Sequence, residues 1–478
     1  MGHLLLAEIV KDWPCTVNGN IGVSIKGITE HSSNVKEGYL FVARKGKKDD
    51  GLLHIQEALE RGAAAIVTDR YAYCAGQREE VPFVLVPDSR RFLSYACAKM
   101  AGNPSKRLTV IAVTGTNGKT TVTHFIGQLL LALGVRVAVL GTTGIFVNGV
   151  KWKIDVPEMT TLPPEYLHPL LKRCEDEGIT HIVMEASSLG LSTLRLEHCD
   201  IDIGVFLNLG IDHYEEHGGK LAYFMAKKKL STMADQLVVN MDDSNCIAMV
   251  NDATAEIYYF NEFMVANEWV PDIQFSGAVL GRHNKMNAMA AISVVRLMGY
   301  SLSELLPFCQ TLVLPAGRLQ RMEIGGTAVY IDYAHTPDAL EAVLEALRTE
   351  WKGGLITVFG CGGDRDRGKR PKMGQIAGKY SSSVIITSDN PRSEDPLDIM
   401  DEIQLGIDSA RGVQIEMEPD RKEAIRKAIF QAREGDVILI AGKGHEETQQ
   451  TAFGITSFSD YRVAMDALLD KNKIQPIE

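Results

Sequence analysis

The sequence predicts an α/β protein with three domains, and three observations support this fold class. The chain has 478 residues, and at roughly 150 residues per domain this length predicts about three domains. Continuous apolar runs rich in β-branched residues alternate with helical patterns, which is typical of parallel sheets buried on both faces. Two breaks in this alternation predict domains at 1–102, 103–316 and 317–478.

The first predicted domain is a small α/β unit. Its β-rich runs fall at residues 39–43, 65–67 and 82–87, and a helical pattern covers 53–61. The segment Asn103-Pro104-Ser105, which follows this unit, contains the residue types of a linker.

The second predicted domain opens on a strand at 108–113, followed by a Gly-rich turn and a helix from about 119 to 133. Further strands are predicted at 135–140, 181–184, 203–207 and 236–239. Helical stretches separate these strands, so a parallel βαβ sheet is the most economical arrangement.

The third predicted domain is another α/β series, which begins after a break containing Pro and Gly at 314–318. Its strands are predicted at 328–331, 355–359, 384–387 and 437–441. Each strand ends in a loop rich in Gly, Asp or Ser, and open α/β sheets bind ligands at the carboxyl ends of their strands. We therefore expect the chemically important residues to lie at this edge.

Composition excludes several classes of protein. The formal charge is −11, from 50 Lys and Arg against 61 Asp and Glu, which argues against general binding to a nucleic-acid backbone. The hydrophobic fraction of 45% and the charged fraction of 23% are typical of a globular chain. The eight cysteines lack metal-type spacing, and no apolar run reaches the roughly 18 residues of a membrane span. We expect a cytoplasmic monomer that binds small molecules, without a nucleic-acid or membrane partner.

The most specific motif is a phosphate-binding loop, Gly115-Thr116-Asn117-Gly118-Lys119-Thr120-Thr121, between a buried strand and a helix. Backbone N–H groups in such a turn bind phosphate oxygens, assisted by the positive end of the helix dipole. Lys119 would reach the terminal phosphates, and the Thr120 hydroxyl would bind Mg²⁺. The strict motif has a glycine where this chain has Val113, but the strand-to-helix context still predicts binding of a nucleoside triphosphate.

Other charged residues of the second domain are less specific. Glu185 ends a predicted strand, where a carboxylate either holds a second Mg²⁺ or is simply solvated. The segment 208–217 places His213 and His217 beside three carboxylates, which favours a functional role. Three consecutive lysines at 227–229 are typical of a solvated helix face, and spacing alone does not distinguish one of them.

Together these motifs resemble the Mur ligase family, the ATP-dependent enzymes that form amide bonds in peptidoglycan precursor synthesis. The matching segments occur in the family's order and cover nearly the whole chain: GTNGKTT (115–121), MEASS (184–188), DHYEEH (212–217), AK (226–227), GRHNKMN (281–287), DYAHTPDALE (332–341), GCGGDRDRGKRPKM (360–373), DNPRSEDP (389–396) and AGKGHE (441–446). The last four are similar to the branch of the family that adds meso-diaminopimelate to UDP-N-acetylmuramoyl-L-alanyl-D-glutamate.

The resemblance implies an N-terminal nucleotide-sugar domain, a central P-loop ATPase domain and a C-terminal Rossmann-like domain, with ligation through an acyl phosphate. It assigns ATP binding to residues 115–121, Asn284, Asn287, Arg318, Asp332 and His335, and Mg²⁺ binding to Thr120, Glu185, His213 and Lys227. Lys119, His213 and Lys227 would be catalytic, Lys227 as a carbamate. Ser32, Thr160, Thr161, Ser187 and Arg195 would bind the nucleotide sugar, and Arg365, Asp389, Asn390, Arg392, Gly442 and Glu446 the amino acid.

The segment Asp389-Asn390-Pro391-Arg392 also has a direct physical interpretation. A predicted strand delivers it to the sheet edge, and Pro391 restricts the turn. Arg392 offers a planar fork for a carboxylate, and Asn390 offers both a donor and an acceptor. Such a site suits an amino acid with a second zwitterionic end, which within the family indicates meso-diaminopimelate rather than L-lysine. Without the family, Arg392 is also consistent with a surface ion pair.

Four departures from the family pattern fall on the nucleotide-sugar side. His31-Ser32-Ser33 replaces an Asp-Ser-Arg sequence, Leu189 a histidine and Thr193 a glutamine, and Leu162 separates Thr160-Thr161 from proline. A paralogue that ligates an amino acid to a different carboxylate is therefore the main alternative. A folylpolyglutamate synthase-like ligase, a non-catalytic nucleotide-binding regulator and a dinucleotide dehydrogenase are weaker alternatives. Folylpolyglutamate synthases usually lack the motif at 389–392, and a non-catalytic regulator would have lost catalytic residues that this chain keeps. A dinucleotide dehydrogenase needs a GxGxxG turn, which opens neither predicted sheet.

Overall fold

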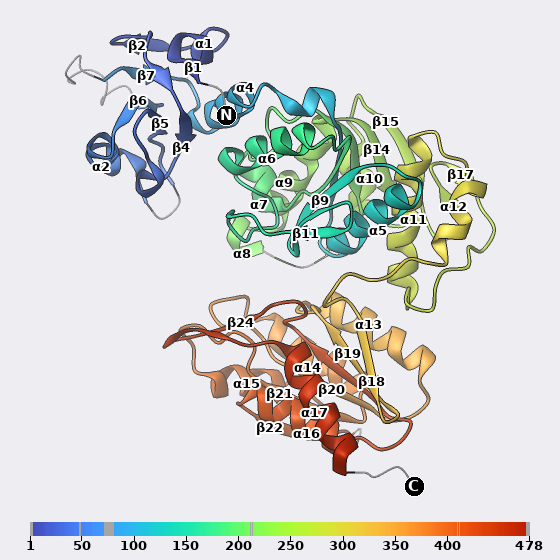
Figure 1. The fold of residues 1–478 in the computed structure, drawn as a ribbon. Coiled ribbons are helices and arrows are strands. Elements are labelled where there is room, and N and C mark those ends of the chain that lie inside the picture. The colour runs from blue at the N-terminus through green and yellow to red at the C-terminus, as the bar shows by residue number, and fades with distance from the viewer. Residues whose placement is uncertain are drawn as a thin grey trace.

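The computed structural model describes residues 3–46, 49–70, 81–210, 212, 214–408, 410 and 412–474. They form three α/β units, each around its own main sheet, so the predicted three-domain α/β fold is confirmed. Figure 1 shows the N-terminal unit beside the central unit, and the C-terminal unit against a different side of it. No helix in these ranges is long and apolar enough to cross a membrane.

The N-terminal unit contains a five-stranded sheet in the order β2-β7-β6-β5-β4, with β4 to β7 parallel and β2 antiparallel. Its elements are β1 (Leu4–Leu5), α1 (Leu6–Val10), β2 (Thr16–Asn18), β3 (Ser24–Ile25), β4 (Gly27–Thr29), η1 (Ser32–Asn34), β5 (Tyr39–Val42), η2 (Gly51–His54), α2 (Ile55–Glu60), β6 (Ala63–Thr68), β7 (Phe83–Leu85), α4 (Ser89–Met100) and η3 (Pro104–Arg107). The predicted helix at 53–61 begins as a 3-10 turn and becomes α-helical at Ile55.

The central unit contains an eight-stranded sheet in the order β11-β10-β9-β12-β8-β13-β14-β15, in which β10 and β11 form an antiparallel extension of a parallel sheet. Its elements are β8 (Thr109–Thr114), α5 (Lys119–Ala132), β9 (Val137–Gly141), β10 (Gly144–Val147), β11 (Val150–Trp152), α6 (Pro164–Asp176), β12 (His181–Glu185), α7 (Ser188–Ser192), β13 (Ile201–Phe206), α8 (Tyr214–His217), α9 (Lys220–Lys228), η4 (Lys229–Thr232), β14 (Ala234–Asn240), α10 (Ser244–Val250), β15 (Glu256–Phe260), β16 (Met264–Val265), β17 (Glu268–Trp269), α11 (Arg282–Leu297) and α12 (Leu302–Cys309). Helices bury an apolar core on each face of the sheet, α5 and α11 on one and α6 on the other.

The C-terminal unit contains a six-stranded sheet in the order β18-β19-β23-β20-β21-β22, parallel except for β18. Its elements are β18 (Gln320–Ile324), β19 (Thr327–Asp332), α13 (Pro337–Glu350), β20 (Leu355–Phe359), α14 (Lys369–Tyr380), β21 (Ser383–Thr387), α15 (Pro396–Gln404), β22 (Gln414–Glu418), α16 (Arg421–Gln431), β23 (Val437–Ala441), β24 (Thr448–Thr451), β25 (Gly454–Ser457) and α17 (Asp460–Ile474). Helices α13, α14 and α15 cover one face, and α16 and α17 cover the other.

The N-terminal and central units meet where α4 packs against α6. Glu165, in the first turn of α6, points into this junction, and its Oε1 accepts a hydrogen bond from Thr29 Oγ1 at 3.0 Å. Its Oε2 is buried without a hydrogen-bond partner among the described residues. Burial and the nearby Glu30 carboxylate raise the pKa of Glu165 to about 7. The folded chain therefore favours the neutral form of this side chain.

We predict that Glu165 makes the chain less stable as the pH rises. An acid whose folded pKa is raised contributes stability below its unfolded pKa, near 4.5, and loses it as the pH rises through about 7. The unfolding free energy of the wild type should fall by on the order of 3 kcal/mol across this pH range. Glu165→Gln stays neutral, so this fall should be absent from the variant. Urea unfolding at a series of pH values measures the difference.

The matched control for this prediction is Glu177→Gln, which changes an exposed carboxylate at the other end of the same helix. The control should follow the wild-type pH profile. If Glu165→Gln also follows the wild-type profile, the junction does not hold a neutral carboxyl group at this position.

Candidate functional site

A cleft of about 740 Å³ lies between the central and C-terminal units. The carboxyl ends of strands from both sheets supply its lining, as the third domain's Gly, Asp and Ser loops predict. The lining includes residues 116–121 after β8, Glu185 on β12, 208–210 after β13, 332–335 at the end of β19, 389–390 and Arg392 after β21, and Gly442 and Glu446 after β23. The phosphate loop and the 389–392 segment therefore face one common space.

The phosphate loop has the conformation that its sequence predicts. Gly118 has φ +89°, and a Cβ there would lie 2.4 Å from Asn287 Oδ1, so glycine is required between β8 and α5. The Lys119 ammonium folds over the loop and donates to the carbonyl oxygens of Gly115 and Thr116 at 2.8 and 3.0 Å. Burial lowers the pKa of Lys119. An anion bound in the loop would give this buried cation a charged partner.

The remaining loop residues are fixed by the loop after β13 and by α9. The Asn117 N–H donates to Asn208 Oδ1 at 2.9 Å, and the Thr116 hydroxyl lies 3.0 Å from the Tyr223 hydroxyl. Thr121 is buried and lines the cleft, as does Asn284 on α11. These contacts hold the loop open toward the cleft.

Glu185 lies beside the phosphate loop, buried at the end of β12. Its Oε1 accepts hydrogen bonds from Thr120 Oγ1 at 3.0 Å and from the Thr142 N–H at 2.9 Å, and its Oε2 accepts from Thr142 Oγ1 at 3.1 Å. Thr142 was not among the predicted site residues, because it follows β9 in a segment without a recognisable motif. A hydroxyl and a carboxylate beside a phosphate loop fit Mg²⁺, which takes one or two carboxylates together with phosphate oxygens and water.

A second group of metal ligands is not seen in the described part of the chain. No group of three or more His, Cys, Asp or Glu side chains there has the arrangement of a metal site. The predicted ligand His213 lies outside the described residues. Its neighbour in the motif, His217, is 3.0 Å from the Ser188 hydroxyl through Nε2.

The structure distinguishes the three consecutive lysines, which the sequence did not. Lys227 is 1% exposed, its Nζ donates to the Gly115 carbonyl at 2.8 Å, and it lies 4.8 Å from the Tyr223 ring centroid. Lys228 pairs with a carboxylate at the surface, and Lys229 is exposed. Burial, together with the positive charge of Lys119, lowers the pKa of Lys227 well below its usual value.

Three predicted nucleotide residues reach the cleft from the C-terminal side. Arg318 crosses to the central unit, where its Nη2 donates to Thr120 Oγ1 at 3.3 Å. Asp332 is buried and accepts the N–H groups of Leu319 and Ala334, both at 2.7 Å, which holds the chain beside Arg318. Burial raises the pKa of Asp332 and lowers that of His335.

The predicted amino-acid residues cluster on the C-terminal side of the cleft. Asn390 Nδ2 donates to Glu446 Oε2 at 3.0 Å, and the fully buried Lys443 donates to both Asn390 Oδ1 and Glu446 Oε2, at 3.1 and 2.8 Å. Asn390 and one Glu446 oxygen are thus engaged within the protein, and they shape the pocket. Lys443 belongs to the AGKGHE motif but was not among the predicted site residues, because its role depends on folding back toward the 389–392 segment.

Charged groups of both signs meet in this pocket. Asp389 Oδ2 is buried without a hydrogen-bond partner in the described structure, and a Cβ on Gly442, which has φ +114°, would lie 2.5 Å from it. Burial and the positive charge of Arg365 lower the pKa of Arg392. Arg365 also pairs with Glu216 of the central unit at 3.6 Å. A pocket with guanidinium and carboxylate groups side by side suits a zwitterion.

A buried ion pair outside the motifs braces the strand ends beneath the pocket. The Arg421 guanidinium and the Asp460 carboxylate are both 0% exposed and form two hydrogen bonds of 2.8 Å. Arg421 also donates to the carbonyl oxygens of Ser388 and Ala441, at 3.3 and 2.9 Å. It therefore ties together the carboxyl ends of β21 and β23, which carry the pocket residues.

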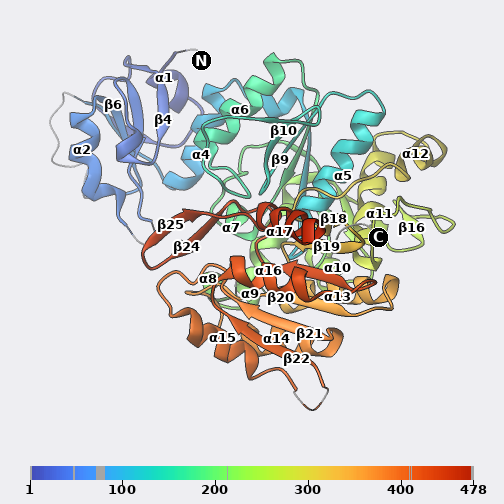
Figure 2. The same cartoon turned by 60° about the horizontal axis from the view of Figure 1, so that its bottom comes forward.

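A second, wider cavity of about 1400 Å³ adjoins the cleft. The two share Thr142, Thr160, Glu185 and Glu446 in their linings. The β24–β25 hairpin contributes to its wall, and Figure 2 shows this hairpin extending toward the N-terminal unit. The wider cavity therefore reaches Glu185 at the end of β12, next to the phosphate loop.

Three of the predicted nucleotide-sugar residues form one hydrogen-bonded group, of which Thr161 lines this cavity. Thr161 Oγ1 lies 3.0 Å from Ser187 Oγ, and Arg195 Nη1 donates to the Thr161 carbonyl at 2.7 Å. The structure does not bring Ser32 to this group, since Ser32 lies in η1 next to Glu57. Instead, Glu30 and Arg44 form an ion pair in the same unit.

Comparisons with known proteins agree with the motifs. Three family models match in order along the chain: "Mur ligase family, catalytic domain" over residues 24–99, "Mur ligase middle domain" over 113–295 and "Mur ligase, glutamate ligase domain" over 317–444. A solved structure named UDP-N-acetylmuramoyl-L-alanyl-D-glutamate–2,6-diaminopimelate ligase covers 98% of this chain and 100% of its own, with a TM-score of 0.68 and 32% identity. MurF ligase from Thermotoga maritima in complex with ADP shares the fold, with a TM-score of 0.61 and 20% identity.

Curated relatives match over their full length. UDP-N-acetylmuramoyl-L-alanyl-D-glutamate–2,6-diaminopimelate ligase of Caldanaerobacter subterraneus is 35% identical over 98% of this chain and 100% of its own. The protein of the same name from Aquifex aeolicus is 38% identical over 93% and 94%, respectively. The chain belongs to the Mur ligase family.

Proposed function

We propose that this chain is the ATP-dependent ligase that adds meso-diaminopimelate to UDP-N-acetylmuramoyl-L-alanyl-D-glutamate during peptidoglycan precursor synthesis. One observation carries the proposal: the phosphate loop and the 389–392 segment line the same cleft. The relatives from Caldanaerobacter subterraneus and Aquifex aeolicus are named for this reaction. The intact motifs on the ATP and amino-acid sides agree with it.

The chemistry requires activation of a carboxylate. An amine does not displace oxide from a carboxylate, but it displaces phosphate from an acyl phosphate. Lys119 and the loop N–H groups would orient the triphosphate and offset its charge. The amine of the amino acid attacks the acyl carbon, the tetrahedral intermediate collapses, and the products are the amide, ADP and phosphate. The cleft places both reactants side by side, and closure of the two units excludes water from the acyl phosphate.

We assign the carboxylate substrate to the wider cavity. That cavity meets the cleft at Thr142, Thr160 and Glu185, next to the phosphate loop, so a peptide carboxylate entering along it would arrive beside the terminal phosphate. Its volume of about 1400 Å³ accommodates a large substrate such as a nucleotide sugar. Thr161 lines this cavity and would contact the substrate, and Ser187 and Arg195 are hydrogen-bonded to Thr161.

Mg²⁺ and a carbamate at Lys227 are part of the proposal. Thr120 and Glu185 would hold the metal, which when bound neutralises phosphate charge. Burial lowers the pKa of Lys227, so its amine is readily neutral, which is the form that reacts with CO₂. Carbamylation would place an anion next to the phosphate loop.

The same proposal includes the domain limits 1–102, 103–316 and 317–478 and a cytoplasmic location, where ATP is available. It also includes a monomeric state.

One alternative is a family member with a different carboxylate substrate, and a specific observation favours it. All the departures from the family pattern lie on the nucleotide-sugar side. Thr193, which replaces a glutamine, donates its hydroxyl to the Leu189 carbonyl at 2.6 Å within its own helix. The Thr193 hydroxyl is therefore already hydrogen-bonded within the protein.

Phosphate release distinguishes these functions. The wild-type chain is incubated with ATP, Mg²⁺ and UDP-N-acetylmuramoyl-L-alanyl-D-glutamate, with meso-diaminopimelate, with L-lysine or without an amino acid. Each incubation is repeated without the nucleotide sugar. The proposal requires release that depends on both the nucleotide sugar and meso-diaminopimelate, and absence of release that depends on this nucleotide sugar would favour the alternative substrate.

Lys119→Ala should reduce ATP-dependent ligation by about 100-fold or more and leave the fold intact, because it removes the cation of the phosphate loop. Phosphate release measures activity, and circular dichroism measures folding. Lys106→Ala, at an exposed lysine of η3 just before β8, is the control and should behave as wild type. Substantial turnover by Lys119→Ala would refute the assignment of the loop.

Arg392→Ala should raise the KM for the amino acid by about tenfold or more, since a charged hydrogen bond contributes roughly 1.5–3 kcal/mol. The KM for ATP should change less than about twofold. The exposed Arg433 of the same unit provides an Arg433→Ala control. An unchanged KM for the amino acid would show that Arg392 does not bind the amino acid.

A further inference from the structure

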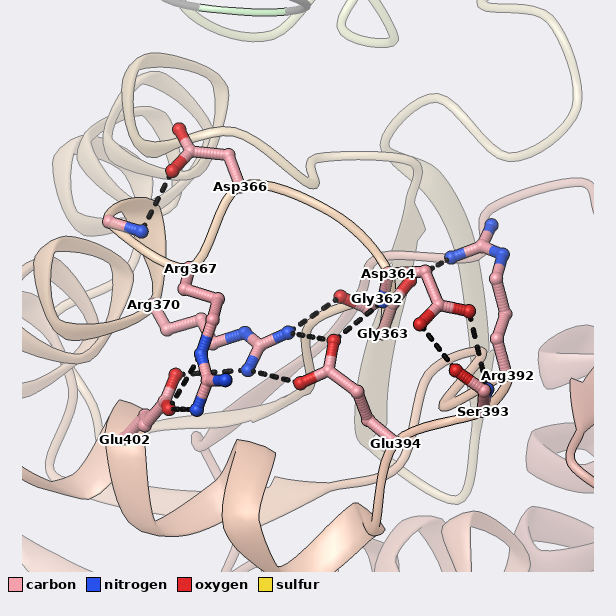
Figure 3. Close-up of polar contacts among 11 residues, drawn as sticks. Gly362, Gly363, Asp364, Asp366, Arg367, Arg370, Arg392, Ser393, Glu394 and Glu402 are labelled. Atoms are coloured by element: carbon pink, nitrogen blue, oxygen red, sulfur yellow. Dashed lines mark hydrogen bonds and ion pairs between the residues drawn. The ribbon is translucent and has the colours of Figure 1, made fainter. Parts of the chain in front are cut away.

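A buried ion-pair network joins the loop after β20 to the loop after β21 (Figure 3). Its centre is Arg370, which is completely buried and donates from Nη1 and Nη2 to the two carboxylate oxygens of Glu394, at 2.9 and 2.8 Å. Arg370 also donates to Glu402 on α15 at 2.9 Å and to the Gly362 carbonyl at 3.4 Å. One guanidinium group therefore contacts both loops and a helix.

Glu394 in turn fixes the backbone of the other loop. Its Oε1 accepts the Asp364 N–H at 2.6 Å, and Asp364 Oδ1 accepts the Ser393 hydroxyl at 2.6 Å. The loops are also joined by a hydrogen bond from the Gly363 N–H to the Asn390 carbonyl at 2.9 Å. Figure 3 shows the contacts of Glu394 and Asp364 between the two loops.

These loops carry the two arginines of the amino-acid pocket, Arg365 and Arg392. Both side chains line the cleft. The backbone of Arg392 has φ +51°, a left-handed conformation that residues other than glycine rarely adopt. The Arg392 Nη1 donates to the Gly363 carbonyl at 2.7 Å. Two guanidinium groups held near each other repel, so their separation depends on the structure behind them. Arg370 and Glu394 form that structure and do not line the cleft.

We propose that the Arg370–Glu394 pair positions Arg365 and Arg392, and that it thereby selects an amino acid with two carboxylates over one with a single carboxylate. This inference rests on the proposed function and deepens it. With the pair intact, each guanidinium has a fixed place for a carboxylate oxygen. Without it, the two loops keep their contacts through Gly363 and Asp364 but lose the ion pair behind them. The site then holds less firmly the second carboxylate of meso-diaminopimelate, which L-lysine lacks.

The experiment compares Arg370→Gln with Arg367→Gln. Both remove an arginine that contacts Glu402, three residues apart, but the Arg367 side chain is 64% exposed and the Arg370 side chain is 0% exposed. Glu394 and Glu402 are 22% and 23% exposed, so water can solvate them after Arg370 is replaced. Phosphate release gives KM and kcat for meso-diaminopimelate, L-lysine and ATP, and thermal unfolding reports folding.

Arg370→Gln should raise the KM for meso-diaminopimelate at least tenfold, change the KM for ATP less than twofold, and lower the preference for meso-diaminopimelate over L-lysine at least tenfold. Arg367→Gln should match the wild type. Glu394→Gln should reproduce the Arg370→Gln effect, and the double variant should be no worse than either single variant, because the two residues act as a unit.

Equal changes in the KM values for ATP and amino acid, or an unchanged preference, overturn the proposal. If Arg370→Gln does not fold, Glu394→Gln is judged by the same criteria, and loss of folding in both variants also overturns it. Amino-acid-dependent phosphate release by the wild type tests the proposed function separately, so failure of one is distinguishable from failure of the other.

Discussion

The site depends on one geometric constraint: the carboxyl ends of two separate parallel sheets must face each other across a narrow cleft. The central sheet contributes the phosphate loop and Glu185, and the C-terminal sheet contributes the 389–392 segment. The contacts that span the gap include those from Arg318 to Thr120 and from Arg365 to Glu216. Neither sheet carries a complete site. Activation and capture of a carboxylate are thus coupled to the docking of one unit on the other.

Charge explains why the nucleotide side is ready for an anion. The ammonium groups of Lys119 and Lys227 both donate to the Gly115 carbonyl, and burial lowers the pKa of each. Phosphate oxygens would give the Lys119 ammonium a charged partner. On the amino-acid side Lys443 pairs with Glu446, and the ion pairs of Arg421 and Arg370 hold the strand ends and loops of the pocket in place.

The sequence predicted the elements whose physics is local. Apolar, β-branched runs predicted β20 and β23 to the residue, because those strands are buried on both faces. Partly exposed strands such as β18 and β22 were not predicted, since their polar residues conceal the apolar pattern. The phosphate loop was also predicted, because its residues are consecutive in the chain and lie between a recognisable strand and helix. Thr142, Lys443 and Arg421 were not, because their contacts join segments far apart in the chain, and Ser32 remains a prediction without contact to the other substrate residues.

The central claim is that the phosphate loop energises a carboxylate for capture by an amine in the same cleft, and isotope transfer tests it most directly. The carboxylate of the nucleotide-sugar substrate is labelled with ¹⁸O, and the phosphate released during ligation is analysed by mass spectrometry. An acyl phosphate carries one carboxylate oxygen into the leaving phosphate, so each phosphate should contain one ¹⁸O atom. Unlabelled phosphate, formed while the amide accumulates, would contradict the account.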